Sequence, residues 1–196
     1  VLRPFVNFID SYKNSIVIFD TIQAKAQLAV VLNAVKPEVQ AFPQFNLRNV
    51  YHPLLYLKNK ASNTQTVPFN LNFKKQTRIL VLSGPNAGGK SVCMKAIGLL
   101  QLMVQSGMMI PANEGAKMGV FKNIFADIGD QQSLEDELST YSSRLQNARK
   151  FIEYAHPKTL ILIDEFGSGT DPKMGAAIAE SILDNLNRQK VFGVIT

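Results

Sequence analysis

One short run of glycine, lysine and serine carries the clearest chemistry in this sequence. Residues 84–91 read Gly-Pro-Asn-Ala-Gly-Gly-Lys-Ser and fill the pattern G-x-x-x-x-G-K-[ST] without a mismatch. Glycines let such a loop wrap an anion with its backbone N–H groups, and the positive end of a following helix points at the same anion. Lys90 could then reach the β- and γ-phosphates, and the Ser91 hydroxyl could hold Mg²⁺.

The run therefore predicts a binding site for a nucleoside triphosphate. Its candidate nucleotide-binding residues are Gly84, Pro85, Asn86, Ala87, Gly88, Gly89, Lys90 and Ser91. The alternative is a glycine-rich turn that only happens to precede a helix. That alternative is disfavoured because an apolar strand pattern precedes the run and a helical pattern follows it, as the motif requires.

Two adjacent carboxylates at the end of an apolar run form the second half of the predicted site. Residues 160–165 read Leu-Ile-Leu-Ile-Asp-Glu, a buried strand that ends in Asp164 and Glu165. Ionised acids in such a place are costly unless they meet a cation or a hydrogen-bond network. Beside a phosphate loop, Asp164 is predicted to support Mg²⁺ and Glu165 to act as the general base on the attacking water. The alternative is an acid pair that simply faces water.

Alternating apolar patterns predict the elements that must position these residues. The candidate strands are 79–82, 120–126, 160–164 and 191–195, and the candidate helices are 90–105, 134–154 and 173–187. Asp171 is the expected N-cap of the last helix, with Pro172 at its first position. This alternation predicts an α/β fold, a P-loop NTPase with a central, mostly parallel sheet flanked by helices.

The first third of the chain has a different character. Residues 1–36 show helical spacing of apolar residues, whereas prolines at 37, 43 and 53 make residues 37–65 read as short strands and loops. We expect a helical segment over 1–45 and the α/β domain over 46–196. The chain begins without methionine and ends within an apolar strand pattern, which favours a fragment of a longer protein.

Composition constrains the partners and the cellular compartment that we expect for this chain. No apolar run approaches the roughly 18 residues of a membrane span, so no membrane partner is expected. A single cysteine, Cys93, fits a reducing compartment such as the cytoplasm, and Cys93 itself reads as a small core residue.

Residues 1–100 hold 12 Lys or Arg and 3 acids. This basic half favours nucleic acid as a partner, although scattered solvated lysines explain it equally well. The densest basic cluster, Lys74-Lys75…Arg78, lies beside the phosphate loop in sequence.

Taken together, these segments resemble the MutS family of ABC-type ATPases. The runs SGPNAGGKS, IFADIGDQQSLEDELSTYSSRL and LILIDEFGSGTDPKMGAA are similar, in order and spacing, to that family's Walker A loop, signature segment and Walker B plus D-loop. The run VYHPLL resembles the element that opens the ATPase domain, and the helical segment resembles the end of the core and lever region. The runs FADIGDQQS, LSTYSS and GTDP resemble most the second bacterial MutS paralogue, which lacks the mismatch-reading domain.

The resemblance implies a Mg²⁺-dependent ATPase that works as a homodimer with two nucleotides between its subunits. It implies that Ser139 reaches the γ-phosphate bound by the opposite subunit, which replaces the local reading of Ser139 as a polar helix start. It also places Asn86 at the dimer interface. The histidine switch that the family would place after Thr196 is absent, as are the clamps, so we expect slow turnover. An aromatic that stacks on adenine is expected near Thr66, where Phe69 is close.

Three functions follow from these predictions. The first couples ATP hydrolysis to DNA binding and recombination control, or to action on stalled ribosomes, in a longer parent protein. The second is the ATPase domain of a mismatch-repair MutS. The third is a nucleotide-gated dimerisation module whose turnover is incidental. A transporter-type subunit is disfavoured because no Leu-Ser-Gly-Gly-Gln signature occurs.

Overall fold

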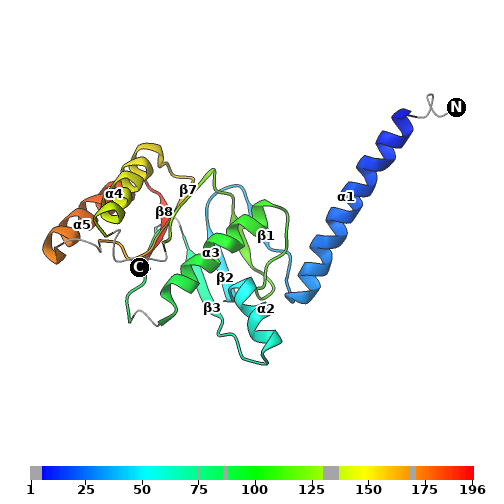
Figure 1. Cartoon of the computed structure of the whole chain (residues 1–196), viewed down its shortest axis with the longest axis horizontal. Helices are drawn as coiled ribbons and strands as arrows, with labels where there is room; N and C mark the ends of the chain where they lie inside the picture. Colours follow the sequence, from blue (N-terminus) through cyan, green and yellow to red (C-terminus); the bar gives the residue numbers. More distant parts are fainter. Residues whose placement is uncertain (1–5, 75, 86–87, 130–136, 168–170) are drawn as a thin grey trace.

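A computed structural model describes residues 6–74, 76–85, 88–129, 137–167 and 171–196, and it contains two four-stranded sheets (Figure 1). The first sheet is mixed and has the strand order β1 (Glu38–Gln40), β5 (Lys117–Gly119), β2 (Phe45–Val50) and β3 (Phe69–Phe73). The second is parallel throughout and has the order β4 (Ile79–Val81), β8 (Phe192–Ile195), β7 (Thr159–Ile163) and β6 (Asn123–Asp127). The α/β fold with a parallel sheet is thus confirmed.

The two central strands of the parallel sheet, β7 and β8, are buried on both faces, which explains their continuous apolar sequences. Successive side chains of a strand point to opposite faces. Leu160 and Leu162 of β7 therefore join the core around α3 (Lys90–Gln105), while Ile161 and Ile163 pack toward α4 (Glu137–Tyr154) and α5 (Pro172–Arg188).

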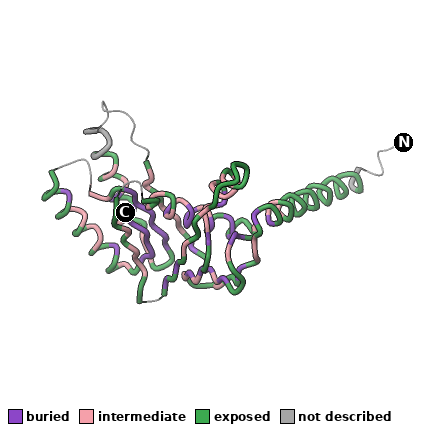
Figure 2. The backbone as a smooth tube through the Cα atoms, turned by 90° about the horizontal axis from the view of Figure 1, so that it is seen from below, coloured by how far each residue is buried: buried purple, intermediate pink, exposed green. Residues whose placement is uncertain are grey.

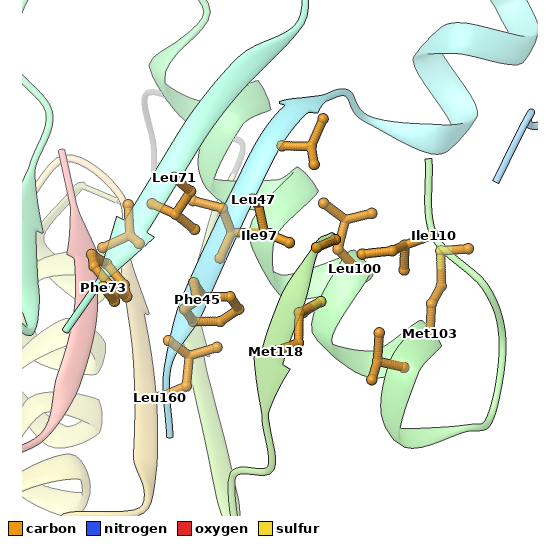
Figure 3. Packing of buried hydrophobic residues seen from close by; sticks show 14 of the residues in the cluster. Phe45, Leu47, Leu71, Phe73, Ile97, Leu100, Met103, Ile110, Met118 and Leu160 are labelled. Carbon is orange, nitrogen blue, oxygen red and sulfur yellow. The ribbon is translucent and has the colours of Figure 1, made fainter. Parts of the chain in front are cut away.

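One continuous core connects the two sheets. Figure 3 shows Phe45 and Phe73 of the first sheet close to Leu160 of the second, with Ile97 and Leu100 of α3 in the same cluster. The ring of Phe73 lies 6.1 Å from that of Phe192 in β8. The first sheet therefore supports the parallel sheet from the side that faces α3.

The helix α1 (Val6–Val31) extends away from the rest of the fold (Figure 1), and Figure 2 shows its exposed surface. Only its last turns reach the core, through buried Ala29 and the following Leu32. None of the helices in the described ranges combines the length and the apolar character that crossing a bilayer requires.

Two local predictions are wrong. The predicted strand 120–126 begins three residues late: residues 123–127 form β6, whereas residues 120–122, with buried Phe121, connect β5 of the first sheet with β6 of the second. Within 37–65, the predicted short strands are present as β1 and β2, but the structure also has a helix that was not predicted, α2 (Pro53–Ala61). Pro53 occupies the first helical position, where a missing N–H costs nothing, so this proline starts a helix.

The other predicted elements lie close to their expected bounds. Strands β4, β7 and β8 fall within one residue of the predicted ranges, and α3 has the predicted range 90–105. The predicted helix 134–154 corresponds to α4, whose preceding residues 130–136 lie outside the described part. Asp171 caps α5 as expected, since its carboxylate accepts from the backbone N–H groups of Lys173 and Met174 at 3.0 and 3.2 Å.

Candidate nucleotide-binding site

Three parallel strands end in register and bring both halves of the candidate site to one edge. Val81 of β4 pairs with Ile195 of β8, which pairs with Ile163 of β7. Neighbouring strands lie about 4.8 Å apart, so β4 and β7 are about 10 Å apart with β8 between them. The glycine loop follows β4 directly, and Asp164 and Glu165 follow β7 directly. The carboxyl ends of the strands therefore place these segments beside each other.

The glycine loop has the backbone that its composition predicts. Gly84 and Gly89 have φ values of 144° and 79°, where a side chain would strain the backbone. A Cβ at either position would meet nothing within 4 Å, so the requirement is conformational and not one of space. Gly89 is the N-cap of α3, and its carbonyl accepts from the Cys93 N–H at 2.9 Å. Asn86 and Ala87 lie outside the described residues.

Lys90 reaches back from the first turn of α3 onto the loop. Its Nζ donates to the carbonyl oxygen of Gly84 and, at 3.1 Å, to that of Pro85. The ammonium group therefore lies on the loop side of an open groove. The groove is lined by residues from both halves of the site and by neighbouring side chains, among them Ser83, Gly84, Lys90, Glu165, Phe166 and Thr196. This groove brings Lys90 and Glu165 to one surface.

The Asp164 carboxylate is buried, with 7% of the residue exposed, and its partner was not predicted. The Thr196 hydroxyl donates to Asp164 Oδ1 at 2.5 Å and accepts from the Glu165 N–H at 2.9 Å. Thr196 follows β8, the strand between the two halves. A hydroxyl residue at the end of the apolar run 191–195 was the available signal, but its role requires knowing that β8 lies between β4 and β7.

Glu165 has a left-handed backbone, with φ of 51°. A non-glycine residue in this region is strained by about 1–2 kcal/mol, and such strain is common at functional sites. Hydrogen bonds on both sides hold it: its N–H donates to Thr196, and the next N–H, of Phe166, donates to the Thr196 carbonyl at 2.9 Å. The turn aims the Glu165 side chain at the edge of the sheet, where 47% of it is exposed.

Arg144 of α4 is a second residue that the sequence did not reveal. Its Nη1 donates to the Glu165 carbonyl oxygen at 3.1 Å, and its Nη2 lies 3.8 Å from Glu165 Oε2. The ion pair is half exposed on the glutamate side and so adds little stability, but it ties α4 to the turn after β7. Ser139 belongs to the same helix, and its side chain lies outside the described part. Arg144 and Glu165 are 21 residues apart, so no local pattern links them.

Ser91 is half-buried in the first turn of α3. Among the residues that the structure describes, no hydrogen bond joins it to Asp164.

Cys93 lies close by on the same helix, and burial raises the pKa of its thiol, which fits the predicted core role. Phe69, expected near the adenine, pairs with Val50 inside the first sheet.

Arg78 of the basic cluster and the glycine loop lie at opposite ends of β4. Arg78 precedes β4, whereas the loop follows it, so the two lie at opposite edges of the sheet. The Arg78 guanidinium donates to Asn187 Oδ1 at 3.0 Å, near the end of α5. Closeness in sequence therefore does not bring Arg78 to the glycine loop, because the strand β4 lies between them.

Comparison with known proteins agrees with this arrangement. The family model for MutS domain V matches residues 80–195, from β4 to the end of β8. The chain is 42% identical over 99% of its length to the endonuclease MutS2 of Lactobacillus helveticus, and 45% identical over 90% to that of Shouchella clausii. It spans 24% and 22% of those two proteins, about a quarter of their length. Because the matched range covers more than half of the chain and contains the glycine loop and the Asp164–Glu165 pair, this protein belongs to the MutS domain V family.

Proposed function

We propose that this chain binds ATP with Mg²⁺ and hydrolyses it. The observation that carries the proposal is the register of β4, β8 and β7, which aligns the glycine loop, Thr196 and the Asp164–Glu165 pair along one edge. Ligands of open parallel sheets bind outside the carboxyl ends of the strands, which is this edge. The MutS2 relatives support the same reading.

The oxygen ligands of this site fit a Mg²⁺ ion that is bound jointly by the protein and by the phosphates of the nucleotide. In the described ranges no group of three or more His, Cys, Asp and Glu side chains could hold a metal on its own. Mg²⁺ commonly binds to one or two carboxylates and to substrate phosphates, and Asp164 supplies one buried carboxylate. Ser91 and Asp164 would hold the ion, which would neutralise charge on the phosphates.

Each remaining residue then has a definite task. Lys90 would exchange its contacts with the loop carbonyls for the phosphates, assisted by the backbone N–H groups of residues 84–91. Glu165 would orient the attacking water as general base. The Thr196 hydroxyl would fix the Asp164 oxygen that it contacts, and Arg144 would hold the turn that carries Glu165.

The open groove supports a site completed by a second subunit. Lys90 and Glu165 border a groove that is open to solvent, and such exposure weakens electrostatic stabilisation of the phosphates. In a homodimer, Ser139 of the opposite subunit would cover the γ-phosphate, and Asn86 would lie at the interface. We expect slow turnover by a single subunit, because its groove between Lys90 and Glu165 is open to solvent.

Turnover of MgATP measured across a wide range of protein concentration tests the proposal, with Lys90→Ala as control. We expect the rate per subunit to rise with concentration and Lys90→Ala to abolish it. ATP binding without turnover at any concentration would leave only a nucleotide-binding module. Brisk turnover at a rate independent of concentration would refute the composite site.

For the longer protein that this chain resembles, we propose that the ATP cycle controls binding of DNA in the cytoplasm, with stalled ribosomes as the alternative target. The relatives are endonucleases MutS2 by name, which favours this branch over mismatch-repair MutS. Glu165→Gln should slow hydrolysis. It therefore distinguishes a protein that uses ATP turnover to control its partner from one that only dimerises when nucleotide binds. If slower hydrolysis leaves release of the partner unchanged, turnover is incidental.

A further inference from the structure

A second set of charged residues lies at the opposite edge of the parallel sheet. Arg78 comes directly before β4, Lys158 directly before β7, and Lys190 two residues before β8. Because these three strands are neighbours and parallel, the residues that precede them meet at one edge. With strands about 4.8 Å apart, the three positions lie within about 10 Å of one another. The four residues of β8 separate this edge from the candidate ATP site by about 13 Å.

These three cations line a hollow of about 540 Å³. The connection between β1 and β2 forms its other wall, and the described residues that line the hollow are Phe42, Pro43, Gln44, Arg78, Pro157, Lys158, Lys190 and Phe192. Phe192 is buried and forms an apolar floor, whereas Phe42 is 57% exposed. None of these described lining residues is acidic. Its volume is within the range of small-ligand sites.

The polar groups of the hollow differ in whether they already make hydrogen bonds or ion pairs within the protein. Arg78 is held by Asn187, which orients its guanidinium. In the part of the chain that the structure describes, the ammonium groups of Lys158 and Lys190 have neither a hydrogen bond nor an ion pair. Two backbone carbonyls of the lining are engaged: that of Gln44 accepts from Gly119 N–H at 2.8 Å, and that of Lys158 from Lys122 N–H at 2.8 Å.

This distribution favours one class of ligand. Several cations beside an exposed aromatic ring and an apolar floor suit a molecule with a phosphate and a flat apolar body. Carboxylates of an acidic peptide could pair with the cations, but they would leave the exposed ring of Phe42 without a flat partner to stack on. A duplex keeps its bases stacked, so an aromatic ring could not reach one face to face.

We propose that this hollow binds a nucleotide unit of single-stranded nucleic acid. Lys158, Lys190 and Arg78 contact the phosphate, and a base stacks on Phe42. The hollow lies on the edge away from the candidate ATP site, so its occupant does not compete with ATP for the glycine loop. This assignment does not depend on ATP hydrolysis.

Fluorescence anisotropy tests the proposal, with a fluorescein-labelled thymidine oligonucleotide of about 12 nucleotides as the probe. All proteins carry Lys90→Ala, which removes the glycine-loop lysine as a phosphate contact. The test variant is Lys158→Glu with Lys190→Asn; asparagine is chosen because Lys190 has φ of 60° and asparagine tolerates that backbone. The control is Lys36→Asn with Lys150→Glu, two exposed lysines outside the hollow whose replacement changes the net charge equally.

We expect the test variant to bind at least about tenfold more weakly than the control. We expect the slope of log K against log salt concentration to fall by about 1.4, the value for two lost contacts to a single strand. Phe42→Ala should weaken binding at least about fivefold, since stacking on an aromatic ring is worth about 1–3 kcal/mol per base. Thermal melts of each variant check that the fold is retained.

Four results would overturn the proposal. Equal losses in the test and control variants would mean that net charge alone attracts the strand. An unchanged affinity in Phe42→Ala would mean that no base stacks there. Displacement of the strand by polyglutamate at equal charge concentration would assign the hollow to an acidic peptide. Displacement by thymidine monophosphate as effective as by unlabelled strand would assign it to a free nucleotide.

Discussion

Replacing Gly119 by alanine tests how the wall of the basic hollow is built. Gly119 ends β5, and its N–H donates to the Gln44 carbonyl at 2.8 Å. A Cβ at this position would lie 2.1 Å from the Phe42 carbonyl oxygen, 2.5 Å from the Gln44 nitrogen and 2.7 Å from the Pro43 Cα. All three are backbone atoms, so no side-chain rotation can relieve the overlap.

The size of the effect follows from these distances. Ordinary contact begins at 3.4 Å, so the connection between β1 and β2 would have to move by about 1.3 Å, the difference between 3.4 and 2.1 Å. Overpacking of this kind costs about 1–3 kcal/mol, and loss of the Gly119–Gln44 hydrogen bond adds about 1 kcal/mol. We therefore expect Gly119→Ala to lower the free energy of unfolding by about 2–4 kcal/mol. For a chain of this size, that lowers Tm by about 4–16 °C.

Thermal and urea unfolding followed by circular dichroism measure this loss, with Gly129→Ala as the matched control. A Cβ at Gly129 would meet no atom within 4 Å, and the backbone there is not left-handed, so alanine should change stability by less than about 0.5 kcal/mol. If Gly119→Ala stays within about 1 kcal/mol of the parent, the close approach of the β1–β2 connection to β5 is refuted. The wall of the hollow would then need a different description.

Two further predictions concern helix ends. Asp171→Ala removes the acceptor for two backbone N–H groups at the start of α5, so it should lower the free energy of unfolding by about 1 kcal/mol; Asp171→Ser should retain most of it, and equal losses in a urea titration would contradict the capping role. His52 caps α2 through Nδ1, and burial lowers its pKa below the ordinary value of about 6.5. Its neutral form is favoured in the folded state, so stability should be complete above about pH 6.5 and decline as the pH falls from there through the lower folded-state pKa. His52→Asn keeps a cap without this titration and should flatten the decline, and an unchanged pH profile would exclude His52 as its source.

The sequence alone determined the chemistry of the candidate site and most of its supporting elements. The glycine loop, Lys90 and the Asp164–Glu165 pair are each contained in a run of at most eight residues, where residue type and spacing set what the backbone and side chains can do. The strand before the acid pair, β7, was predictable because a strand buried on both faces is continuously apolar. The N-cap at Asp171 was predictable for the same local reason.

Only the tertiary structure decided which residues join that site and which form a second one. The order β4, β8, β7 sets Thr196 between the glycine loop and Asp164, and it gathers Arg78, Lys158 and Lys190 at the opposite edge. Strand order in a parallel sheet depends on long crossover connections and on packing against both sheet faces, and neither leaves a pattern in neighbouring residues. The contact of Arg144 with Glu165 spans 21 residues and depends on where α4 packs. Short runs of residues therefore supplied the functional groups, and the packing of distant segments decided their neighbours.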